Sequence, residues 1–401
     1  MTVSTSSDIL YDPNDPVTFA DPYPMFRRLR EEAPLYHNEE LGFFALSRFD
    51  DVERALVDTT TFSSRYSPIF ESIRARVDLP QGVFIAEDPP MHTAHRGVLS
   101  RVFTPKKMSA LEPQVRAYCA EALDPLVGGD RIDFVADLGA KMPMRVIGMM
   151  LGIPEEDQQE IRVRADRRMR RDSEPTDGYS SPAADPTYVA DYIRWRATHP
   201  SDDLMTELLE VEFEDPTGEV RRLNEQEIIT FVNVLTVAGN ETTNRLIGWT
   251  GKVLGDHPDQ RRQLVEDRGL IPNAIEEILR FEPPGSHIGR YVARNVELHG
   301  TMVPEGSAIL LIHGAANRDH RAFPPDGDVF DITRTIGHHM TFGYGIHFCL
   351  GAALARLEGR IALDEVLDRF PEWTVDLEQA ELAPSVVRGW DTLPAYVGTK
   401  I

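Results

Sequence analysis

Cys349 lies in the segment of the chain best suited to chemistry, which runs from Phe342 to Gly351 and reads FGYGIHFCLG. Gly343 and Gly345 allow tight turns with positive φ and a close approach to a flat ligand. The cysteine stands where this loop meets a helical pattern, and the N–H groups and positive dipole end of a helix favour an anion. We therefore expect its thiol to ionise readily. Such a thiolate, shielded and rigidly held, can ligate iron and promote cleavage of an O–O bond.

A second group of reactive side chains lies about 110 residues earlier, in the run AGNET from Ala238 to Thr242. The run interrupts a long helical pattern, and a glycine inside a helix costs about 1 kcal/mol relative to alanine. Thr242 can return its hydroxyl to the carbonyl of Ala238, which would bend the helix and make room for dioxygen and water. Glu241 and Thr242 form an acid–alcohol pair, so this run predicts proton delivery.

Two helices must position these groups. The first begins at Asn224, an N-cap candidate whose capping-box partner is Glu227, and continues to about Gly255, where Pro258 stops it. At ~1.5 Å per residue it would span roughly 45 Å. We expect a helix of this length to cross the centre of the molecule. The second helix follows the cysteine, over about 350–369.

The rest of the chain predicts a mostly α fold with a small β-rich region. Further helices are expected at about 22–32, 50–58, 92–103, 108–126, 136–151, 155–171, from 186 or 187 onward, and 270–281. Strands are expected at 42–46 and, as hairpins, over 290–311. The irregular parts are expected at 63–88, 173–187 and after 369. No charge run divides the chain, so we expect one domain over 1–401.

Composition excludes several classes of protein. The formal net charge of −23 disfavours nucleic acids and acidic membranes as partners. Two cysteines, Cys119 and Cys349, allow at most one disulfide, which favours a reducing compartment. Residues 1–15 lack the apolar core of a signal peptide, and no apolar run approaches 18 residues. We therefore expect a cytoplasmic, soluble enzyme without a membrane anchor.

The cysteine segment closely resembles the haem-binding signature of the cytochrome P-450 family, and the resemblance extends in order from about Asp88 to Arg388. It implies a triangular helical prism that encloses haem b, iron protoporphyrin IX, between the long helix and the helix after the cysteine. Cys349 would be the axial iron ligand. The family's oxygen-activation motif matches Ala238, Gly239, Glu241 and Thr242, and the haem-loop positions match Phe342, Gly343 and Gly351. The family often has histidine where this chain has Asn240.

The resemblance also implies residues that hold the haem and brace its site. The haem propionates would be bound by His92, Arg96, Arg290 and His347. Around the first two, the chain departs from the family's helix at Met91, which is often glutamate, and at His95, which is usually apolar. A structural ion network would join Glu277, Arg280 and Arg334. Read without the family, Glu277 and Arg280 are three residues apart and suit a surface ion pair.

The substrate pocket implied by the resemblance is apolar. Its candidate contacts, each of which also suits a plain core position, are Phe70, Phe84, Ile85, Val234, Val237, Ile288 and Val387. A basic run contains Arg162, Arg164, Arg167, Arg168, Arg170 and Arg171. These arginines suit a solvated helix face, or one of them could anchor a substrate carboxylate.

Electrons would come from NAD(P)H through a ferredoxin reductase and a ferredoxin, because the chain has no flavin or iron–sulfur motif of its own. The ferredoxin would dock on the cysteine side of a monomer, with contacts to Arg101, Lys106, Lys107, His338, His339, Arg356 and Arg360.

The resemblance implies a monooxygenase that hydroxylates or epoxidises a lipid, terpenoid, steroid or natural-product intermediate. A peroxygenase fed by hydrogen peroxide is an alternative, although it has less need of Glu241 and Thr242. A non-catalytic haem gas sensor is another, but it requires a signalling partner or an output domain, and none is visible in the sequence.

Overall fold

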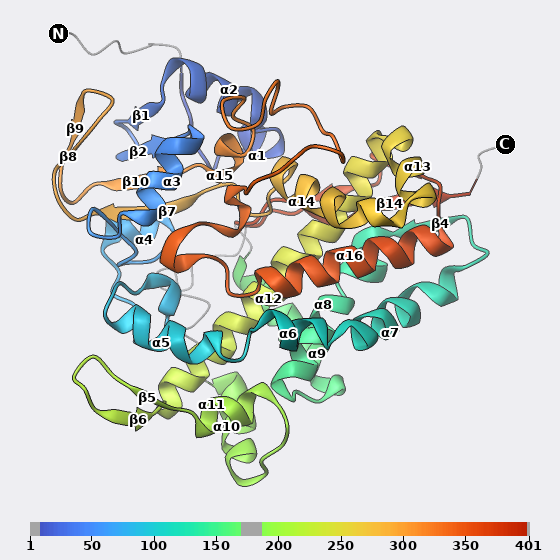
Figure 1. The fold of residues 1–401 in the computed structure, drawn as a ribbon, viewed down its shortest axis with the longest axis horizontal. Coiled ribbons are helices and arrows are strands. Elements are labelled where there is room, and N and C mark those ends of the chain that lie inside the picture. The colour runs from blue at the N-terminus through green and yellow to red at the C-terminus, as the bar shows by residue number, and fades with distance from the viewer. Residues whose placement is uncertain (1–8, 170–186, 399–401) are drawn as a thin grey trace. The chain divides into compact units, whose positions relative to one another are not determined.

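The computed structural model describes residues 9–169 and 187–398 (Figure 1). The chain forms two compact units whose segments alternate along the sequence, and each is described by itself. Unit 1 comprises residues 1–79, 285–330 and 336–349, and unit 2 comprises residues 80–284, 331–335 and 350–401. The single domain expected over 1–401 stays a prediction. Within the described ranges, no helix combines the length and apolar character needed to cross a membrane.

The elements of unit 1 are α1 (Pro16–Ala20), α2 (Tyr23–Glu32), β1 (Leu35–Asn38), β2 (Phe43–Leu46), α3 (Phe49–Val57), β3 (Phe62–Ser63), α4 (Phe70–Ala75), β7 (Ile288–Val292), β8 (Val296–Leu298), β9 (Thr301–Val303), β10 (Ala308–Leu311), α15 (His313–Ala316), η6 (Met340–Phe342) and η7 (Gly345–His347). Five of the strands form one sheet in the order β1-β2-β10-β7-β3. The strands β2 and β10 pair in parallel, and the other neighbours pair antiparallel.

The central strands β2 and β10 are buried along their whole length. Because successive side chains of a strand point to opposite faces, Phe44 and Ile309 pack into one apolar core with α3. On the opposite face, Phe43 and Leu310 pack into a second core with α2 and α4. Continuous apolar runs such as FFAL and AILL are what a sheet covered on both faces requires.

The elements of unit 2 are η1 (Phe84–Ala86), α5 (Met91–Ser100), α6 (Pro105–Ser109), α7 (Glu112–Leu123), η2 (Asp124–Leu126), β4 (Arg131–Asp133), the π-helix η3 (Phe134–Gly139), α8 (Met142–Leu151), α9 (Glu155–Met169), α10 (Thr187–Thr198), α11 (Leu204–Glu210), β5 (Glu212–Glu214), β6 (Val220–Arg222), α12 (Glu225–Asp256), α13 (Pro258–Glu266), η5 (Arg268–Leu270), α14 (Ile271–Phe281), α16 (Ala352–Arg369), β11 (Trp373–Val375), β12 (Glu381–Leu382), β13 (Trp390–Thr392) and β14 (Pro394–Val397).

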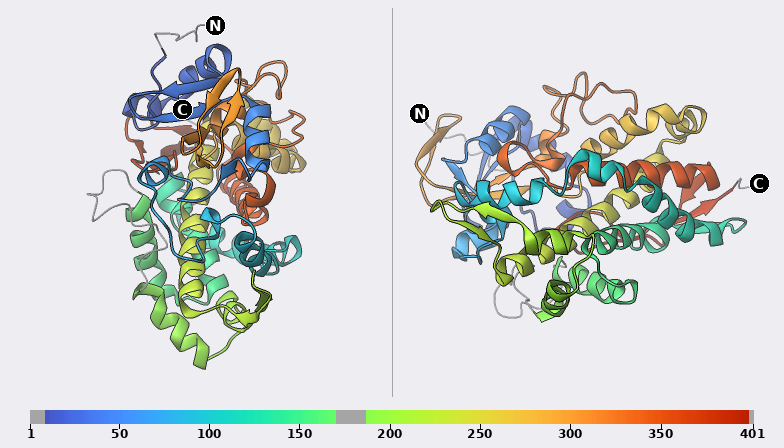
Figure 2. Two further views of the ribbon diagram at one scale, coloured as in Figure 1. Left: turned by 90° about the vertical axis from the view of Figure 1, so that its left-hand side faces the viewer. Right: turned by 60° about the horizontal axis from the view of Figure 1, so that its bottom comes forward.

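Helix α12 is the structural axis of unit 2. It packs against η3, α8, α14 and α16, and Figures 1 and 2 show it running beside α16. Glycines allow these close approaches: a Cβ on Gly251 would lie 2.5 Å from Cγ of Phe134, and one on Gly359 would lie 2.9 Å from Leu246. A helix covered on so many sides is buried nearly all round, and most residues of α12 from Glu227 to Leu254 are buried, polar ones included.

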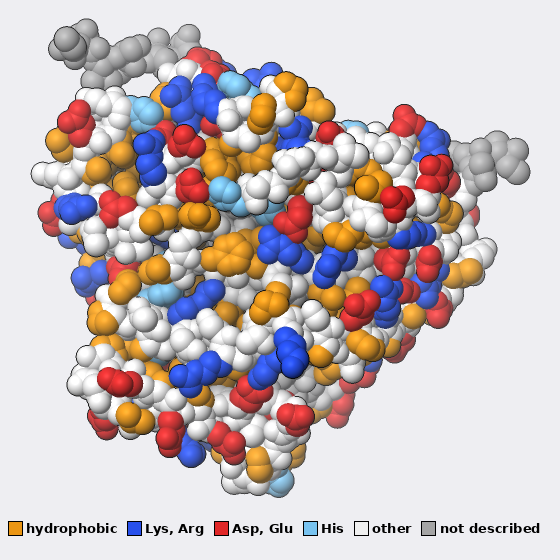
Figure 3. Space-filling view, viewed as in Figure 1, with side chains coloured by type: hydrophobic (Ala, Val, Ile, Leu, Met, Phe, Trp, Pro, Cys, Tyr) orange, Lys and Arg blue, Asp and Glu red, His pale blue; other side chains and the backbone are white. Residues whose placement is uncertain are grey.

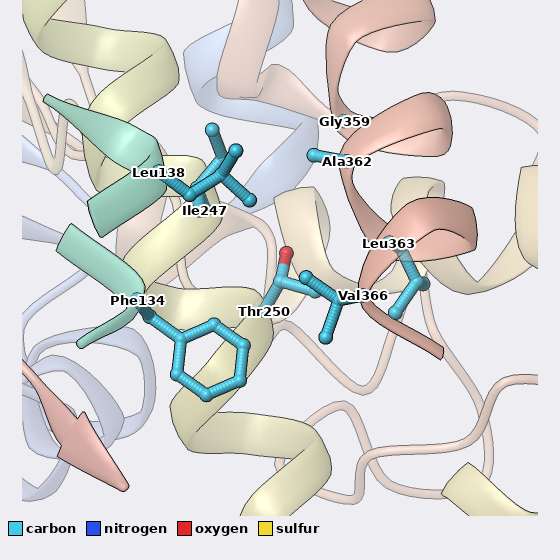
Figure 4. A pocket seen from close by; sticks show the side chains of 8 residues that line it. All are labelled: Phe134, Leu138, Ile247, Thr250, Gly359, Ala362, Leu363 and Val366. Atoms are coloured by element: carbon cyan, nitrogen blue, oxygen red, sulfur yellow. The ribbon is translucent and has the colours of Figure 1, made fainter. Parts of the chain in front are cut away.

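A small apolar cavity remains between α12, η3 and α16 (Figure 4). Its lining consists of Phe134, Leu138, Ile247, Thr250, Gly359, Ala362, Leu363 and Val366. A cavity this small and this apolar offers a water molecule almost no hydrogen-bonding partners, so it is a gap in packing rather than a binding site.

Several expectations about the elements are wrong. The tail after residue 369 is not irregular, because it contains the strands β11 to β14, and β14 pairs with β4 of the distant segment 131–133. Such pairing leaves no local signal. Segment 63–88 contains the helix α4, and the expected helix 108–126 consists of the end of α6, the helix α7 and the 3-10 helix η2. Pro258 not only follows α12 but occupies the first turn of α13, where its missing N–H costs nothing.

The start of α12 is anchored by ion pairs. As expected, Asn224 Oδ1 accepts from Glu227 N at 2.9 Å, and Glu227 Oε2 accepts from Asn224 N at 2.8 Å. The Glu227 carboxylate is buried and also accepts from both terminal nitrogens of Arg221 on β6, at 2.8 Å each. Burial alone would raise the pKa of Glu227, but the hydrogen bonds from Arg221, His95 and Asn224 hold it well below its usual range.

His95 completes this anchor from α5. Its ring is fully buried, with Nδ1 2.8 Å from Glu87 Oε2 and Nε2 3.4 Å from Glu227 Oε1. Burial favours the neutral imidazole, but the hydrogen bonds to Glu227 and Glu87 outweigh it and raise the pKa of His95 to about 9. The departure from the family at this position therefore places a protonated imidazole between two carboxylates, and it ties α5 to α12.

We predict that raising the pH from 6.5 to 10 lowers the stability of His95→Leu less than that of the wild-type protein. The contribution of His95 is fully present below the unfolded pKa of 6.5 and is lost as pH rises through about 9. The contribution of Glu227 to stability is present above its unfolded pKa of 4.5 and is lost as the pH falls below that value. A rise from 6.5 to about 9 is worth roughly 3 kcal/mol. The apparent Tm of the variant, measured by circular dichroism, should lie several degrees below that of wild type at pH 6.5. The difference should be much smaller at pH 10.

The control is His299→Leu, which removes an exposed imidazole 2.8 Å from Asp51 and should change Tm little at any pH, because water screens an exposed pair. A difference between His95→Leu and wild type that stayed constant from pH 6 to pH 10 would contradict the assignment.

Candidate functional site

The cysteine loop of unit 1 has the backbone expected from its glycines. Gly343 and Gly345 have φ of +67° and +70°. Cys349 N donates to the carbonyl of Phe342 at 2.7 Å, which closes the loop. A Cβ on Gly345 would lie 2.9 Å from the carbonyl oxygen of Leu56, so glycine also allows the loop to pack directly on the end of α3.

Asn317, at the end of α15, fixes the start of this loop, and sequence reasoning missed it. Its fully buried side chain accepts from Met340 N at 2.6 Å and donates to Thr341 Oγ1 at 2.8 Å. A lone asparagine after a four-residue helix carries no signal in the sequence. The fold alone brings it to the loop.

The two cysteines lie in opposite surroundings, and neither is in a disulfide. Cys349 is exposed, whereas Cys119 is buried in α7, where burial raises the pKa of its thiol to about 12. Near Cys349 in the chain, Ile346 and Phe348 are 39% and 38% exposed. An exposed sulfur in an apolar loop suits a flat, apolar ligand. Helix α16 begins at Ala352 after the N-cap Gly351, two residues later than expected.

Two of the four predicted propionate donors lie in unit 1. Arg290 on β7 is buried and donates to the carbonyl of Gly289 at 2.9 Å. His347 Nε2 lies 2.9 Å from Ser64 Oγ. His313, which sequence reasoning missed, is completely buried, and burial followed by Arg290 lowers the pKa of its imidazole to about 3. Burial, with the charge of Arg290 as a second cause, therefore favours the neutral imidazole of His313.

The other two donors, His92 and Arg96, lie one turn apart on α5 in unit 2. Burial, followed by the charge of Arg96, lowers the pKa of His92 to about 4. The role of His92 as a propionate donor stays a prediction. A neutral imidazole can bind a carboxylate through its N–H, while Arg96 supplies the charge.

Helix α12 has one opening along its buried middle. From Glu227 to Gly251, every residue is buried except Ala238, Gly239 and Thr242. Thr242 Oγ1 donates to the carbonyl of Ala238 at 2.7 Å, as expected. The helix nevertheless continues without the expected interruption. Packing does not demand the glycine, because a methyl on Gly239 would meet Ile147 at an ordinary 3.5 Å. Because Gly239 has no side chain, no side chain projects from the helix at this accessible position.

Glu241 lies beside this opening but is buried, and Arg245 one turn later forms an ion pair with its Oε1. Its Oε2 has no hydrogen-bonding partner among the residues that the structure describes. Asn240, where the family often has histidine, is also buried. Sequence reasoning missed Arg245, although the i,i+4 spacing from Glu241 was a signal for an ion pair.

A further acid, Glu358 on α16, is completely buried, and it was also missed. Burial raises the pKa of its carboxyl to about 8, and a hydrogen bond from the Thr243 side chain offsets this only in part. The group is therefore mostly a neutral acid near pH 7.

The predicted ion network forms within unit 2. Arg280 binds both carboxylate oxygens of Glu277 at 2.6 Å, and Arg334 Nε lies 3.3 Å from Glu277 Oε1. Asp331 N donates to the same oxygen at 2.9 Å. Glu277 and Arg280 are fully buried, which excludes the surface ion pair that the spacing alone allowed. Every oxygen of the carboxylate is satisfied, as a buried charge requires.

The predicted pocket residues are distributed over both units. The ring centroids of Phe70 and Phe43 lie 5.4 Å apart in a core of unit 1, which favours a role for Phe70 in core packing rather than in substrate binding. In unit 2, Phe84 packs edge-on to Phe231, and Ile85 is exposed. The remaining candidates are buried or half-buried, namely Val234, Val237, Ile288 and Val387.

The basic run is only partly within the described structure. Arg162 is half-buried on α9, 3.3 Å from Gln159 Oε1. The other members, whose side chains lie outside the described residues, are Arg164, Arg167, Arg168, Arg170 and Arg171.

Comparisons with known proteins show the family of the chain. A family model described as cytochrome P-450 matches residues 185–385. A cytochrome P-450 of Mycobacterium tuberculosis is 37% identical over 398 residues, which cover 97% of each chain. The vitamin D(3) 25-hydroxylase of Pseudonocardia autotrophica is 33% identical over 411 residues and 100% of both chains. The structure of CYP109E1 from Bacillus megaterium in complex with testosterone matches with a TM-score of 0.84 and 30% identity, over 96% of this chain and 99% of the other. With its glycine-framed cysteine and its similarity over nearly the whole length, the chain belongs to the cytochrome P-450 family of monooxygenases.

Proposed function

We propose that Cys349 binds the iron of haem b and that the chain uses two electrons and dioxygen to hydroxylate or epoxidise a small, largely apolar substrate. The observation that carries the proposal is the opening in α12. In its buried middle Ala238 is exposed and Gly239 and Thr242 are half-buried, and a buried carboxylate, Glu241, lies beside them. A hydroxyl and an acid at one gap in an apolar wall are the groups that oxygen chemistry needs.

The residues present fit haem. Cys349 offers an exposed sulfur in a loop with exposed apolar side chains, which suits a flat macrocycle with an axial thiolate. The propionates would be held by His92, Arg96, Arg290 and His347. When bound, a thiolate-ligated haem supplies the electron density that promotes O–O cleavage.

The side chains of α12 would manage protons. The hydroxyl of Thr242 now donates to Ala238, and rotation about χ1 would offer it to the exposed face instead. The Glu241 carboxylate would relay protons through Oε2, because it can accept a proton there and then pass it on. This division keeps bulk water away from the reacting atoms, because the rest of the helix middle is buried.

Two other functions fit less well. A peroxygenase receives its oxygen already protonated and has less need of Glu241 and Thr242. A gas sensor needs neither group and requires a partner that reads out binding. The acid–alcohol pair at the opening therefore favours activation of dioxygen.

The substrate is proposed to be a lipid, terpenoid, steroid or natural-product intermediate. One relative is named for vitamin D(3), another, from Saccharopolyspora erythraea, for 6-deoxyerythronolide B, and a similar structure holds testosterone. The candidate contacts on this chain are apolar, with Val234 and Val237 on the turn of α12 that precedes the opening.

A ferredoxin is proposed as the electron donor. Figure 3 shows Lys and Arg side chains over α5, α6 and the first turns of α16 in unit 2. Lys107 and Arg356 are paired with Glu207 and Glu276 at 2.9 and 2.6 Å, so their charges are partly balanced within the chain. The steering of an acidic carrier would then weaken as salt is added.

We predict that the purified protein contains haem and that its reduced carbon monoxide complex has the red-shifted Soret band of a thiolate ligand. Cys349→Ser should abolish this band, because a serine hydroxyl does not ionise to replace the thiolate. Absorption spectra of the two proteins provide the measurement. Cys119→Ser is the matched control and should keep the band. The proposal fails if wild type lacks the band or if Cys349→Ser retains it.

We also predict that Thr242→Val lowers the product formed per NAD(P)H consumed by roughly 10²-fold, the usual effect of a lost proton-transfer group. The missing electrons should appear as hydrogen peroxide. The control is Thr250→Val, because Thr250 donates to the carbonyl of Leu246 at 2.8 Å in the same helix but away from the opening. Equal losses of product in the two variants would contradict a specific role for Thr242.

A further inference from the structure

One buried guanidinium on α12 is shared between two carboxylates. Arg245 donates through Nη2 to Glu241 Oε1, one turn earlier in the helix, and to Asp391 Oδ1 on β13, at 3.3 Å. Its Nη1 donates to the carbonyl of Trp390. All of these groups belong to unit 2. The charge of Arg245 therefore connects the acid beside the opening to a strand near the C-terminus.

The surrounding packing is shaped for this arginine. A Cβ on Gly389 would lie 2.4 Å from Cδ of Arg245, so the stem of the arginine packs where the residue just before β13 has no side chain. On the next turn of α12, Trp249 Nε1 donates to the carbonyl of Arg388 at 3.0 Å. The segment 388–391 is thus held against α12, and Arg245 cannot be displaced without moving it.

The two carboxylates differ in their access to water. The side chain of Glu241 is 2% exposed and that of Asp391 is 30% exposed. A buried carboxylate needs a cation, whereas a partly exposed one can be solvated by water. Arg245 is always charged, so it also needs an anion whenever Glu241 moves. Asp391 and the Trp390 carbonyl can serve Arg245 in that moment, so the buried guanidinium keeps hydrogen-bonding partners when Glu241 leaves it.

We propose that Arg245 is a positioning residue for oxygen activation, which holds Glu241 beside the opening of α12 and passes to Asp391 when Glu241 turns toward Thr242. The inference rests on the proposed function. It assigns no proton transfer to Arg245 itself. The arginine determines the position of the Glu241 carboxylate and how easily the ion pair between the two side chains breaks.

The test is a double-substitution cycle in the holoenzyme with Glu241→Gln, Arg245→Gln and the combined variant. Arg245→Gln should lower the product formed per NAD(P)H by about tenfold, a coupling usual for contacting groups. It should also change the solvent isotope effect on product formation, with KM unchanged. In the Glu241→Gln background, Arg245→Gln should have no further effect. Additive losses would overturn the proposal, because they would mean that Arg245 does not act through Glu241.

Two further variants keep the test decisive. Arg245→Lys should recover part of the coupling, because a lysine can still pair with Glu241. Asp391→Asn leaves the buried pair intact, so it carries the test if Arg245→Gln does not fold. It should slow product formation and increase the solvent isotope effect, because Arg245 has lost its alternative anion. An unchanged solvent isotope effect in Asp391→Asn would overturn the proposal that Arg245 passes from Glu241 to Asp391.

Arg261→Gln is the matched control. Arg261 is another buried arginine of unit 2 that binds one carboxylate, Glu372, and one carbonyl of a C-terminal strand, that of Trp373 at 2.9 Å. It has no contact with Glu241, so its loss should lower Tm while leaving coupling and isotope effect unchanged. A change in coupling equal to that of Arg245→Gln would assign the effect to general destabilisation.

Crystal structures give a readout independent of turnover. The Glu241 side chain should take a new rotamer in Arg245→Gln and keep its position in Asp391→Asn. The same position in all three proteins would contradict a positioning role. If the carbon monoxide complexes lack the thiolate band, the proposed function itself fails. If the band is present and the cycle is additive, only the role of Arg245 is wrong.

Discussion

The cost of burying polar groups along α12 is the constraint on which the rest of unit 2 depends. A helix covered by η3, α8, α14 and α16 has little water to solvate a charge, so each polar side chain in its middle needs a protein partner. Glu227 has Arg221 and His95, and Glu241 has Arg245. Thr236 and Thr250 return their hydroxyls to carbonyls of the preceding turn. These pairings decide which neighbouring elements the helix can accept.

The opening at Ala238, Gly239 and Thr242 gains its meaning from this background. A helix that is exposed along one whole face offers many positions where a polar group meets solvent, so exposure alone does not single out any of them as a functional position. Here three positions of the buried middle are accessible, and a small residue occupies two of them. The acid that accompanies them is held in place by an ion pair with Arg245 on its own helix, and Arg245 in turn contacts β13.

The cysteine loop of unit 1 depends on a different constraint, which is backbone geometry. Two glycines with positive φ and one hydrogen bond from Cys349 to Phe342 define its shape. Asn317 fixes its start, and α3 supports it at Gly345. Cys349 is thereby an exposed residue of the loop, whereas the other cysteine, Cys119, is buried in α7, and burial raises the pKa of its thiol to about 12.

The sequence by itself determined the features that rest on local rules. These are the capping box at Asn224, the glycine loop before Cys349, the return of the Thr242 hydroxyl to its own helix, and the mostly helical fold, because each depends on residues a few positions apart. Only the tertiary structure decided the partners of buried charges. His95 meets Glu227 across more than a hundred residues, Arg245 meets Asp391 across a similar distance, and β14 meets β4 from the far end of the chain. Such contacts follow from which surfaces are buried together, and no spacing along the sequence records that.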